Sequence, residues 1–297
     1  MHDQAEKLRQ MVQEFSNQSP KPLQQQHQQA PKTRVITVTS GKGGVGKTNF
    51  TVNLALAFSA LGQKVLLIDA DLGMANVDVI LGTSSQYSVL HLLQDGIGLQ
   101  DILTEGPRGI KFMSGGSGIS QLSNLSPLEL QHILTQIAVC DKWADIVLID
   151  TGAGLSRNVM NFVMAADEVI VITTPEPTAM TDAYAMIKAY ASHSGTAPLK
   201  LVINRVNEFD EGKLVADKLL NVTKRFLGIS ITYLGVIYED RNLIGAVKNQ
   251  VPLLIYSPQT ISARCIEQIA QRLLHKEIVH QPKGIRGFFN KFFEILS

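Results

Sequence analysis

Cysteines, long apolar runs and a signal sequence are scarce or missing in this chain of 297 residues. Its two cysteines, Cys140 and Cys265, lie far apart, and neither belongs to a C-x-x-C pair or to a Cys/His cluster with metal-binding spacing. This disfavours a cysteine-ligated metal or iron–sulfur site and favours two reduced thiols. No segment approaches the roughly 18 apolar residues of a spanning helix, and the N-terminus MHDQAEKLRQ lacks the pattern of a signal peptide. We therefore expect a cytoplasmic protein.

An excess of charge of one sign is also missing. The chain has 27 Lys and Arg against 26 Asp and Glu, a formal net charge of +1. This balance argues against a strongly basic nucleic-acid-binding domain, although it leaves room for a local basic patch. A hydrophobic content of 45% with only 18% charged residues is typical of a soluble globular protein with one substantial core.

The first 33 residues divide into two segments. In DQAEKLRQMVQEF the apolar residues recur at helical spacing, with Asp3 as a possible N-cap and Glu6 as its capping-box partner, which predicts a short helix within residues 1–18. Residues 19–33, SPKPLQQQHQQAPKT, predict a flexible Pro/Gln linker. A helix on such a tether could bind another protein without disturbing the rest of the chain. An unstructured extension with chance helicity is the alternative.

Residues 34–276 predict one doubly wound α/β domain, with a mostly parallel sheet and helices on both faces. Short apolar runs that suit buried strands alternate with segments of helical pattern, as expected for a parallel sheet covered on both sides. The strand-like runs are VITVT, KVLLID, IVLID, EVIVIT, LKLVIN and ITYLGVI, and the helical segments include residues 46–61, 127–140, 178–193 and 257–275.

The stretch SGKGGVGKTN follows the first of these strands and contains the P-loop pattern G-x-x-x-x-G-K-[ST] from Gly41 to Thr48. Its glycines allow backbone N–H groups to face phosphate oxygens at the start of a helix. Lys47 is expected to reach the β- and γ-phosphates, and Thr48 to ligate Mg²⁺. The expected nucleotide-binding residues of the loop are Gly41, Gly43, Gly44, Val45, Gly46, Lys47, Thr48 and Asn49.

The first lysine of KGGVGKT, Lys42, is not needed for that geometry, because Lys47 already serves the phosphates. This run resembles the deviant Walker A motif of the MinD/ParA family of P-loop ATPases, over roughly residues 34–275. The resemblance implies ATP and Mg²⁺ as cofactors, and a homodimer in which Lys42 reaches the nucleotide of the other subunit. A cation supplied in trans neutralises γ-phosphate charge only when two subunits face each other, so hydrolysis is expected to depend on dimerisation. A solvated loop lysine is the alternative.

Three aspartates follow two of the strand-like runs. Asp69 and Asp71 form a D-x-D pair after KVLLI, and Asp150 ends IVLID, positions where an α/β sheet places its ligands. The resemblance implies that Asp71 orients the attacking water, that Asp69 lies near the metal, and that Asp150 holds the Mg²⁺ shell through water. Gly152 and Gly154 are expected to let the following loop respond to the γ-phosphate.

Four residues are candidates for contacts with the base. The family uses an asparagine amide to read adenine just after a strand, where this chain has Asn204, and the loop after ITYLGVI supplies Tyr238, Glu239 and Asp240. The family often has proline in place of Tyr238, although an aromatic ring there could lie against the base. A turn residue at the end of a strand is the alternative role for Asn204.

The tail, residues 283–297, is set apart by Pro282 and Gly284 and has the pattern of an amphipathic helix. Its expected apolar side carries Ile285, Phe288, Phe289, Phe292, Phe293 and Leu296. Four phenylalanines opposite a basic polar side favour a helix that binds the membrane surface, and MinD-type proteins carry such a tail. A dimer presents two tails, so ATP is expected to control residence at the inner face of the cell membrane. Packing against the domain is the alternative.

The N-terminal DQAEKLRQ resembles the DQAxxLR element of FlhG-type ATPases, MinD-like regulators of flagellar number and placement, and TTPEPTAMTDAYAMIK also resembles that group. In that group the element binds the SRP-type GTPase FlhF and stimulates its hydrolysis, which implies partner contacts by Asp3, Gln4, Ala5, Leu8 and Arg9. Proteins of the flagellar cytoplasmic ring are further implied partners. A MinD-like septum-site regulator is the first alternative. A ParA-like DNA partitioner is less favoured, because the charge is balanced and the tail apolar.

Overall fold

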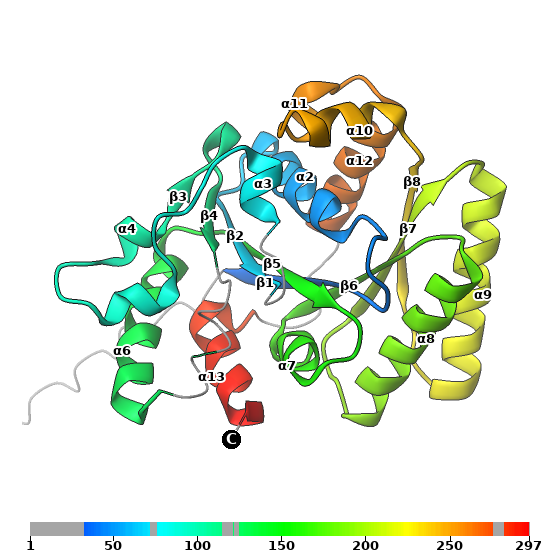
Figure 1. The fold of residues 1–297 in the computed structure, drawn as a ribbon. Coiled ribbons are helices and arrows are strands. Elements are labelled where there is room, and N and C mark those ends of the chain that lie inside the picture. Colours follow the sequence, from blue (N-terminus) through cyan, green and yellow to red (C-terminus); the bar gives the residue numbers. More distant parts are fainter. Residues whose placement is uncertain (1–32, 72–75, 115–120, 122–124, 276–281, 297) are drawn as a thin grey trace, which may run out of the picture. The chain divides into compact units, whose positions relative to one another are not determined.

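An eight-stranded sheet forms the centre of the computed structural model of this protein, with helices on both of its faces (Figure 1). The structure describes residues 33–71, 76–114, 121, 125–275 and 282–296. The N-terminal helix and nearly all of the linker predicted before the first strand lie outside these residues. The predicted partner-binding residues Asp3 to Arg9 therefore also lie outside them.

The strand order is β3-β4-β2-β5-β1-β6-β7-β8, and every neighbouring pair is parallel except β3 and β4. The strands are β1 (Arg34–Ser40), β2 (Val65–Ala70), β3 (Thr104–Glu105), β4 (Lys111–Ser114), β5 (Ile146–Ala153), β6 (Glu168–Thr173), β7 (Leu199–Val206) and β8 (Thr232–Tyr238). All residues of β1, β2 and β6 are buried, as expected for strands covered on both faces.

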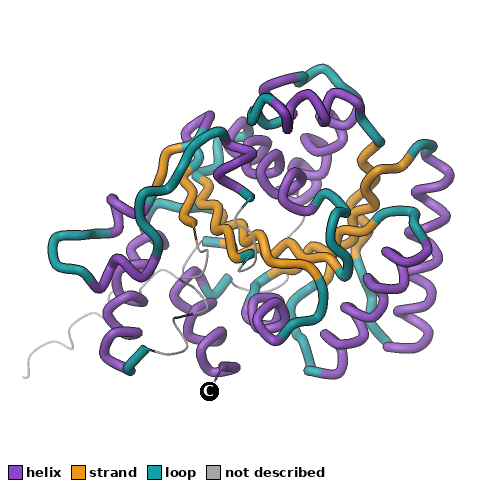
Figure 2. The backbone as a smooth tube through the Cα atoms, in the orientation of Figure 1, coloured by secondary structure: helices purple, strands orange, loops and turns teal. Residues whose placement is uncertain are grey.

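The helices divide between the two faces of the sheet, as Figure 2 shows. One face carries α2 (Lys47–Ala60), α3 (Val77–Leu81), α10 (Arg241–Lys248), α11 (Leu253–Tyr256) and α12 (Ile261–His275). The other carries α6 (Pro127–Ile137), α7 (Arg157–Ala165), α8 (Pro177–Ser192), α9 (Phe209–Leu227) and α13 (Gly284–Leu296). A cluster of buried hydrophobic residues lies on each face of the sheet, and neighbouring residues of β1 belong to different clusters. Val35 packs in the cluster with α7 and α13, and Ile36 packs in the cluster with α2 and α12. The predicted doubly wound α/β fold is confirmed.

Short elements connect β2 to β5 and depart from the sequence prediction. They are α4 (Leu99–Ile102) and the 3₁₀ helices η1 (Val89–Leu93), η2 (Pro107–Gly109) and η4 (Ala138–Lys142). The antiparallel edge strand β3 and its neighbour β4 were not among the predicted strands, because both are too short to show a period. The helix expected over 127–140 ends at Ile137 and continues as η4.

The predicted helix over 257–275 begins four residues late, at Ile261. Residues 257–260 form a turn, in which the Thr260 N–H donates to the Ser257 carbonyl. The Thr260 hydroxyl then accepts the Ala263 N–H at 3.2 Å, so a side-chain cap fixes the start of the helix.

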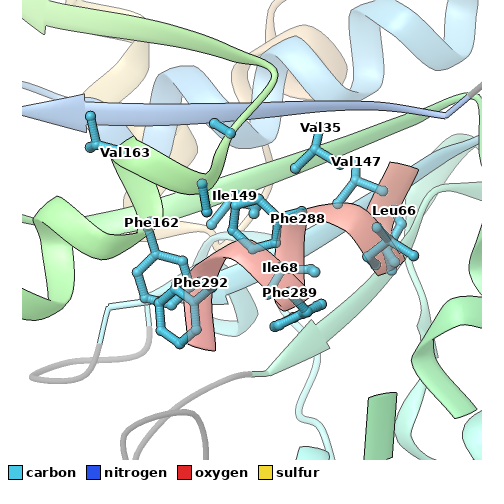
Figure 3. Close-up of a cluster of buried hydrophobic side chains, with 14 of the residues drawn as sticks. Val35, Leu66, Ile68, Val147, Ile149, Phe162, Val163, Phe288, Phe289 and Phe292 are labelled. Atoms are coloured by element: carbon cyan, nitrogen blue, oxygen red, sulfur yellow. The ribbon is translucent and has the colours of Figure 1, made fainter. Parts of the chain in front are cut away.

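The tail forms the predicted helix, α13, and its apolar side lies against the domain (Figure 3). Ile285, Phe288, Phe289 and Phe292 are at most 2% exposed, and Phe293 is half-buried. The rings of Phe292 and Phe162 of α7 have centroids 4.5 Å apart. The side chain of Leu296 lies outside what the structure describes. The sequence left open whether this helix binds the membrane surface or packs against the domain, and in the structure it packs against the domain.

Within the described part of the chain, none of the helices combines the length and the apolar composition required to cross a bilayer.

Candidate nucleotide-binding site

The P-loop joins the carboxyl end of β1 to the start of α2, and three of its glycines are required by the geometry. Gly44 and Gly46 have left-handed φ values of 78° and 88°, which side chains with a Cβ rarely adopt. A Cβ on Gly46 would lie 2.4 Å from Nδ2 of Asn204. A Cβ on Gly41 would lie 2.2 Å from the backbone of Asp182 in α8. The loop is therefore packed between β7 and α8 in a shape that only glycine permits.

Lys47 begins α2 and points at the carboxylate of Asp150 in β5. Its Nζ lies 3.0 Å from Oδ1 of Asp150, and the hydroxyl of Thr51 donates to the same oxygen at 3.0 Å. Both charges are buried, with side-chain exposures of 7% and 1%. The second carboxylate oxygen of Asp150 is buried without a hydrogen-bond partner among the described residues. A buried acceptor left open in this way suits a ligand or a cation.

Asp69 lies beside Asp150, because the two residues are in register on the neighbouring strands β2 and β5. Its carboxylate accepts the backbone N–H groups of Asp71 at 3.1 Å, Asn76 at 3.0 Å and Val77 at 3.1 Å. Burial, and secondly the charge of Asp150, raises the pKa of Asp69 to about 7. Two buried carboxylates side by side favour a hard cation that takes oxygen ligands.

These donors fit the expected Mg²⁺. Asp150 offers an open carboxylate oxygen, Asp69 adds a second buried acid, and Thr48 lies in the first turn of α2, next to Lys47. A bound Mg²⁺ would neutralise phosphate charge and help to hold the phosphates in line with Lys47.

Asp71 directly follows β2 and lies at the same end of the sheet. A Cβ built on Gly152 would lie 3.5 Å from Oδ1 of Asp71, so this carboxylate faces the segment that follows Asp150. Gly154 in that segment has a left-handed φ of 90°. The three aspartates therefore surround one region, while the positioning of water by Asp71 remains a prediction.

The four candidates for base recognition line one cavity of about 500 Å³ together with Gly44, Gly46 and Asn49. Asn204 donates Nδ2 to the carbonyl of Val45 at 2.7 Å, which leaves its amide oxygen as the atom that can accept the amino group of a base. Tyr238 is half-buried at the end of β8. Apolar side chains complete the lining, among them Phe50, Ile237, Leu243, Leu253 and Ile266.

The two acidic candidates, Glu239 and Asp240, also have hydrogen-bond partners within the protein. Glu239 accepts a hydrogen bond from Nε of Arg205 at 2.8 Å, and Asp240 caps α10 by accepting the N–H of Asn242 at 2.8 Å. Their place in the cavity wall is therefore fixed by contacts within the protein.

A cavity of this composition beside a P-loop and a buried aspartate pair fits a nucleotide, and the comparison with known proteins shows a nucleotide-binding family. The family model for the CobQ/CobB/MinD/ParA nucleotide binding domain matches residues 36–253. The chain belongs to this family. Its resemblance to MinD/ParA proteins is thereby confirmed, and the protein is an ATPase of the MinD/ParA type.

Individual relatives of this MinD/ParA ATPase cover nearly its whole length. The antiactivator FleN of Pseudomonas aeruginosa is 37% identical over 256 residues, which is 86% of this chain and 91% of FleN. The flagellum site-determining protein YlxH of Helicobacter pylori is 35% identical over 271 residues, 89% of this chain and 91% of YlxH. A solved structure of the septum site-determining protein MinD with Mg-ADP, from Pyrococcus horikoshii, is 25% identical with a TM-score of 0.63, covering 81% of this chain and 96% of that one.

Lys42, the first lysine of KGGVGKT in this MinD/ParA ATPase, bonds to residues of its own chain in the structure. Nζ of Lys42 lies 3.0 Å from Oε2 of Glu176 and 2.8 Å from the hydroxyl of Thr178, at the start of α8. The hydrogen bond from Lys42 lowers the pKa of Glu176. The pair is partly exposed, with 38% and 54% of the two side chains accessible, so water screens it. Action of Lys42 in trans remains a prediction.

Three contributors to the site were missed from the sequence. Thr51 shares Asp150 with Lys47, and its position one helical turn after the lysine was an available signal. Asn53 accepts the N–H of Leu254 at 2.9 Å and donates to the Asn49 carbonyl at 2.7 Å, so it links α2 to α11 beside the cavity. Arg205 has a left-handed φ of 57° directly after Asn204, and nothing in the sequence pattern marks it.

Proposed function

We propose that this MinD/ParA ATPase regulates flagellar number, placement and assembly, as an ATP-dependent homodimer that associates with the membrane. The observation that carries the proposal is a complete P-loop site in a chain that is 37% identical to FleN and 35% identical to YlxH over most of its length. The name of YlxH describes it as flagellum site-determining. The DQAEKLRQ segment supports the same group.

Dimerisation would place Lys42 at the nucleotide of the partner subunit. The contact with Glu176 and Thr178 shows that the side chain is long enough to leave its own phosphate loop and reach a neighbouring element. Its partial exposure means that little desolvation opposes a change of partner. Hydrolysis would then require two subunits, because the stabilising cation arrives from the second one.

Membrane association would require α13 to leave its position against the domain. The side chains proposed to enter the lipid are Ile285, Phe288, Phe289, Phe292, Phe293 and Leu296, and the first four are buried against the domain here. A lipid surface can replace this apolar environment, while the polar side of the helix keeps Arg286 and Lys291 for anionic headgroups. We therefore place the protein in the cytoplasm, and at the inner face of the cell membrane when ATP is bound.

The membrane role is tested by removing residues 283–297. The truncated protein should still hydrolyse ATP and dimerise, but should no longer sediment with anionic vesicles in the presence of ATP. Phe289→Glu should behave similarly, because it places a charge on the apolar side. Equal sedimentation of the truncated and full-length proteins would defeat this part of the proposal.

The N-terminal segment is proposed to stimulate an SRP-type GTPase of the FlhF kind, with contacts from Asp3, Gln4, Ala5, Leu8 and Arg9. Flagellar cytoplasmic-ring proteins are proposed as further partners. Deletion of residues 1–20 should abolish GTPase stimulation while leaving ATP hydrolysis intact. Stimulation that survives the deletion would remove the reason for assigning this role to the segment.

A septum-site regulator of the MinD type is the second candidate, favoured by the likeness to the P. horikoshii MinD structure. Such a protein would share ATP binding, dimer and tail, but would have no use for DQAEKLRQ. The same deletion separates the two candidates. A DNA partitioner is not favoured, because the net charge is only +1. Salt-dependent retention of DNA by the ATP dimer would revive that candidate.

A further inference from the structure

The start of α13 is held by carboxylates from the domain. The first backbone N–H groups of a helix have no acceptor within the helix. Here Oδ1 of Asp141, in η4, accepts the N–H of Ile285 at 2.7 Å, and its Oδ2 accepts that of Arg286 at 3.3 Å. The charged cap of this helix is therefore supplied by a residue 144 positions earlier in the chain.

A second carboxylate holds the residue just before the helix. Oδ1 of Asp167 accepts the N–H of Lys283 at 3.0 Å, and its Oδ2 accepts the N–H of Val35 in β1 at 3.0 Å. The N–H of Asp167 also donates to the Val35 carbonyl at 3.0 Å, so this residue is anchored to the start of the central strand. Asp167 thus connects Lys283, just before α13, to strand β1 of the sheet.

A left-handed glycine brings the two sets of donors together. Gly284 has a φ of 70°, which turns the chain between Lys283 and the first helical N–H groups. The sequence K-G-I-R therefore presents donors to Asp167 and Asp141 in a single tight turn. We refer to Asp141 and Asp167 as the carboxylate clasp.

We infer that the carboxylate clasp sets the balance between the docked and the membrane-bound tail, an inference that rests on the proposed membrane role of α13. Burial of the phenylalanines contributes to both states, since a groove and a bilayer each remove them from water. Their contribution therefore largely cancels. The clasp hydrogen bonds exist only in the docked state, whereas attraction of Lys283 and Arg286 to anionic lipid exists only at the membrane.

The clasp also lies close to α7, the helix that follows β5. α7 begins at Arg157, shortly after Gly154, and ends two residues before Asp167. It carries Phe162, whose ring packs against Phe292. A shift of α7 on nucleotide exchange would act on the clasp and on the aromatic contact together.

The test uses Asp141→Ala in the full-length protein, with Asp145→Ala as the matched control. The Asp145 carboxylate also accepts one backbone N–H, that of Lys64 at 2.8 Å, but has no contact with the tail among the described hydrogen bonds. Loss of a charged cap should raise the open fraction of the tail about fivefold or more. Hydrogen–deuterium exchange of residues 284–296, with ADP and no lipid, measures this fraction directly.

The expected result is faster exchange in Asp141→Ala than in the wild type and Asp145→Ala, an intermediate rate in Asp141→Asn, and increased sedimentation of Asp141→Ala with anionic vesicles in ADP. Unchanged exchange would overturn the clasp. Faster exchange without increased vesicle binding would keep the clasp as a docking device but contradict the membrane role and this balance. If Asp141→Ala does not fold, Gly284→Ala tests the same turn from the tail, because a Cβ there is strained.

Discussion

The nucleotide end of the sheet and the face covered by α13 use the same strands, but the first has a buried acceptor without a partner among the described residues and the second is fully packed. At the nucleotide end, one oxygen of Asp150 lacks a partner and burial raises the pKa of Asp69 to about 7. Under α13, the phenylalanines are buried and the first N–H groups of the helix are bonded to Asp141. The first region offers that buried acceptor to a ligand, whereas the second is already filled by the chain's own tail.

The largest effect is expected from Lys47→Ala at the nucleotide end of the sheet. This substitution removes the ammonium group expected to contact the phosphates and leaves the buried carboxylate of Asp150 without its charged partner. Removing one partner of a buried charge pair across a binding interface costs about 2–5 kcal/mol of binding free energy, so nucleotide affinity should fall about 100-fold in a titration with a fluorescent ATP analogue. Lys64→Ala, at an exposed lysine, is the control. Affinity within threefold of the wild type would show that Lys47 does not serve the phosphates.

Phe288→Ala should disrupt the packing of α13 against the domain. Phe288 is 1% exposed and packs against Phe162, so its truncation should cost about 3–5 kcal/mol, most of it as loss of tail docking. Limited proteolysis should then cleave residues 284–296 at least about 100-fold faster than in the wild type. Phe226→Ala, at a side chain 66% exposed, should leave the rate unchanged. Equal protection of both variants would mean that the aromatic contacts do not hold the tail.

The raised pKa of Asp69 predicts a pH dependence of the ligand-free protein. A carboxyl whose pKa is about 7 folded and near 3.8 unfolded binds its proton more tightly in the folded state. Stability should therefore fall as pH rises from about 4 to 7 and then level off, with a total loss on the order of 2–4 kcal/mol. Thermal melting of the wild type and Asp69→Asn across this range measures it. A pH profile no steeper in the wild type than in Asp69→Asn would contradict the assignment.

The smallest effect is expected from Thr51→Val, which keeps the side-chain shape but removes one hydrogen bond to Asp150. The free energy of unfolding should fall by about 1–2 kcal/mol, because a buried carboxylate loses a donor. Thr135→Val, at an exposed helical threonine whose hydroxyl donates to the carbonyl one turn earlier, is the matched control. Chemical denaturation distinguishes them, and equal midpoints would show that Thr51 does not matter to the site.

Local spacing explains how much of the nucleotide end could be predicted from the sequence. The P-loop glycines, Lys47 and Thr48 lie within one short run, and Asp69 and Asp150 each end an apolar strand. Parallel strands bring such ends to one edge of the sheet, so their meeting followed from the fold class. Thr51 was missed because its hydroxyl gains meaning only once Asp150 is placed beside it.

The tail could be predicted as a helix but not placed. An apolar side of phenylalanines satisfies a protein groove and a lipid surface equally well, so periodicity does not distinguish the two. The contacts that decide the position come from distant residues: Asp141 and Asp167 lie more than 100 positions before the tail. No local pattern marks either aspartate as a helix cap.

The central claim is that the nucleotide state controls the position of α13. Its most direct measurement is hydrogen–deuterium exchange of residues 284–296 without lipid, comparing the wild type in ADP with Asp71→Ala in ATP. Asp71→Ala should bind ATP but hydrolyse it about 100-fold more slowly, which should trap the proposed dimer. The tail should be protected in ADP and should exchange at least about tenfold faster in the trapped dimer. Equal protection in both states, with the dimer demonstrated by light scattering, would contradict the claim.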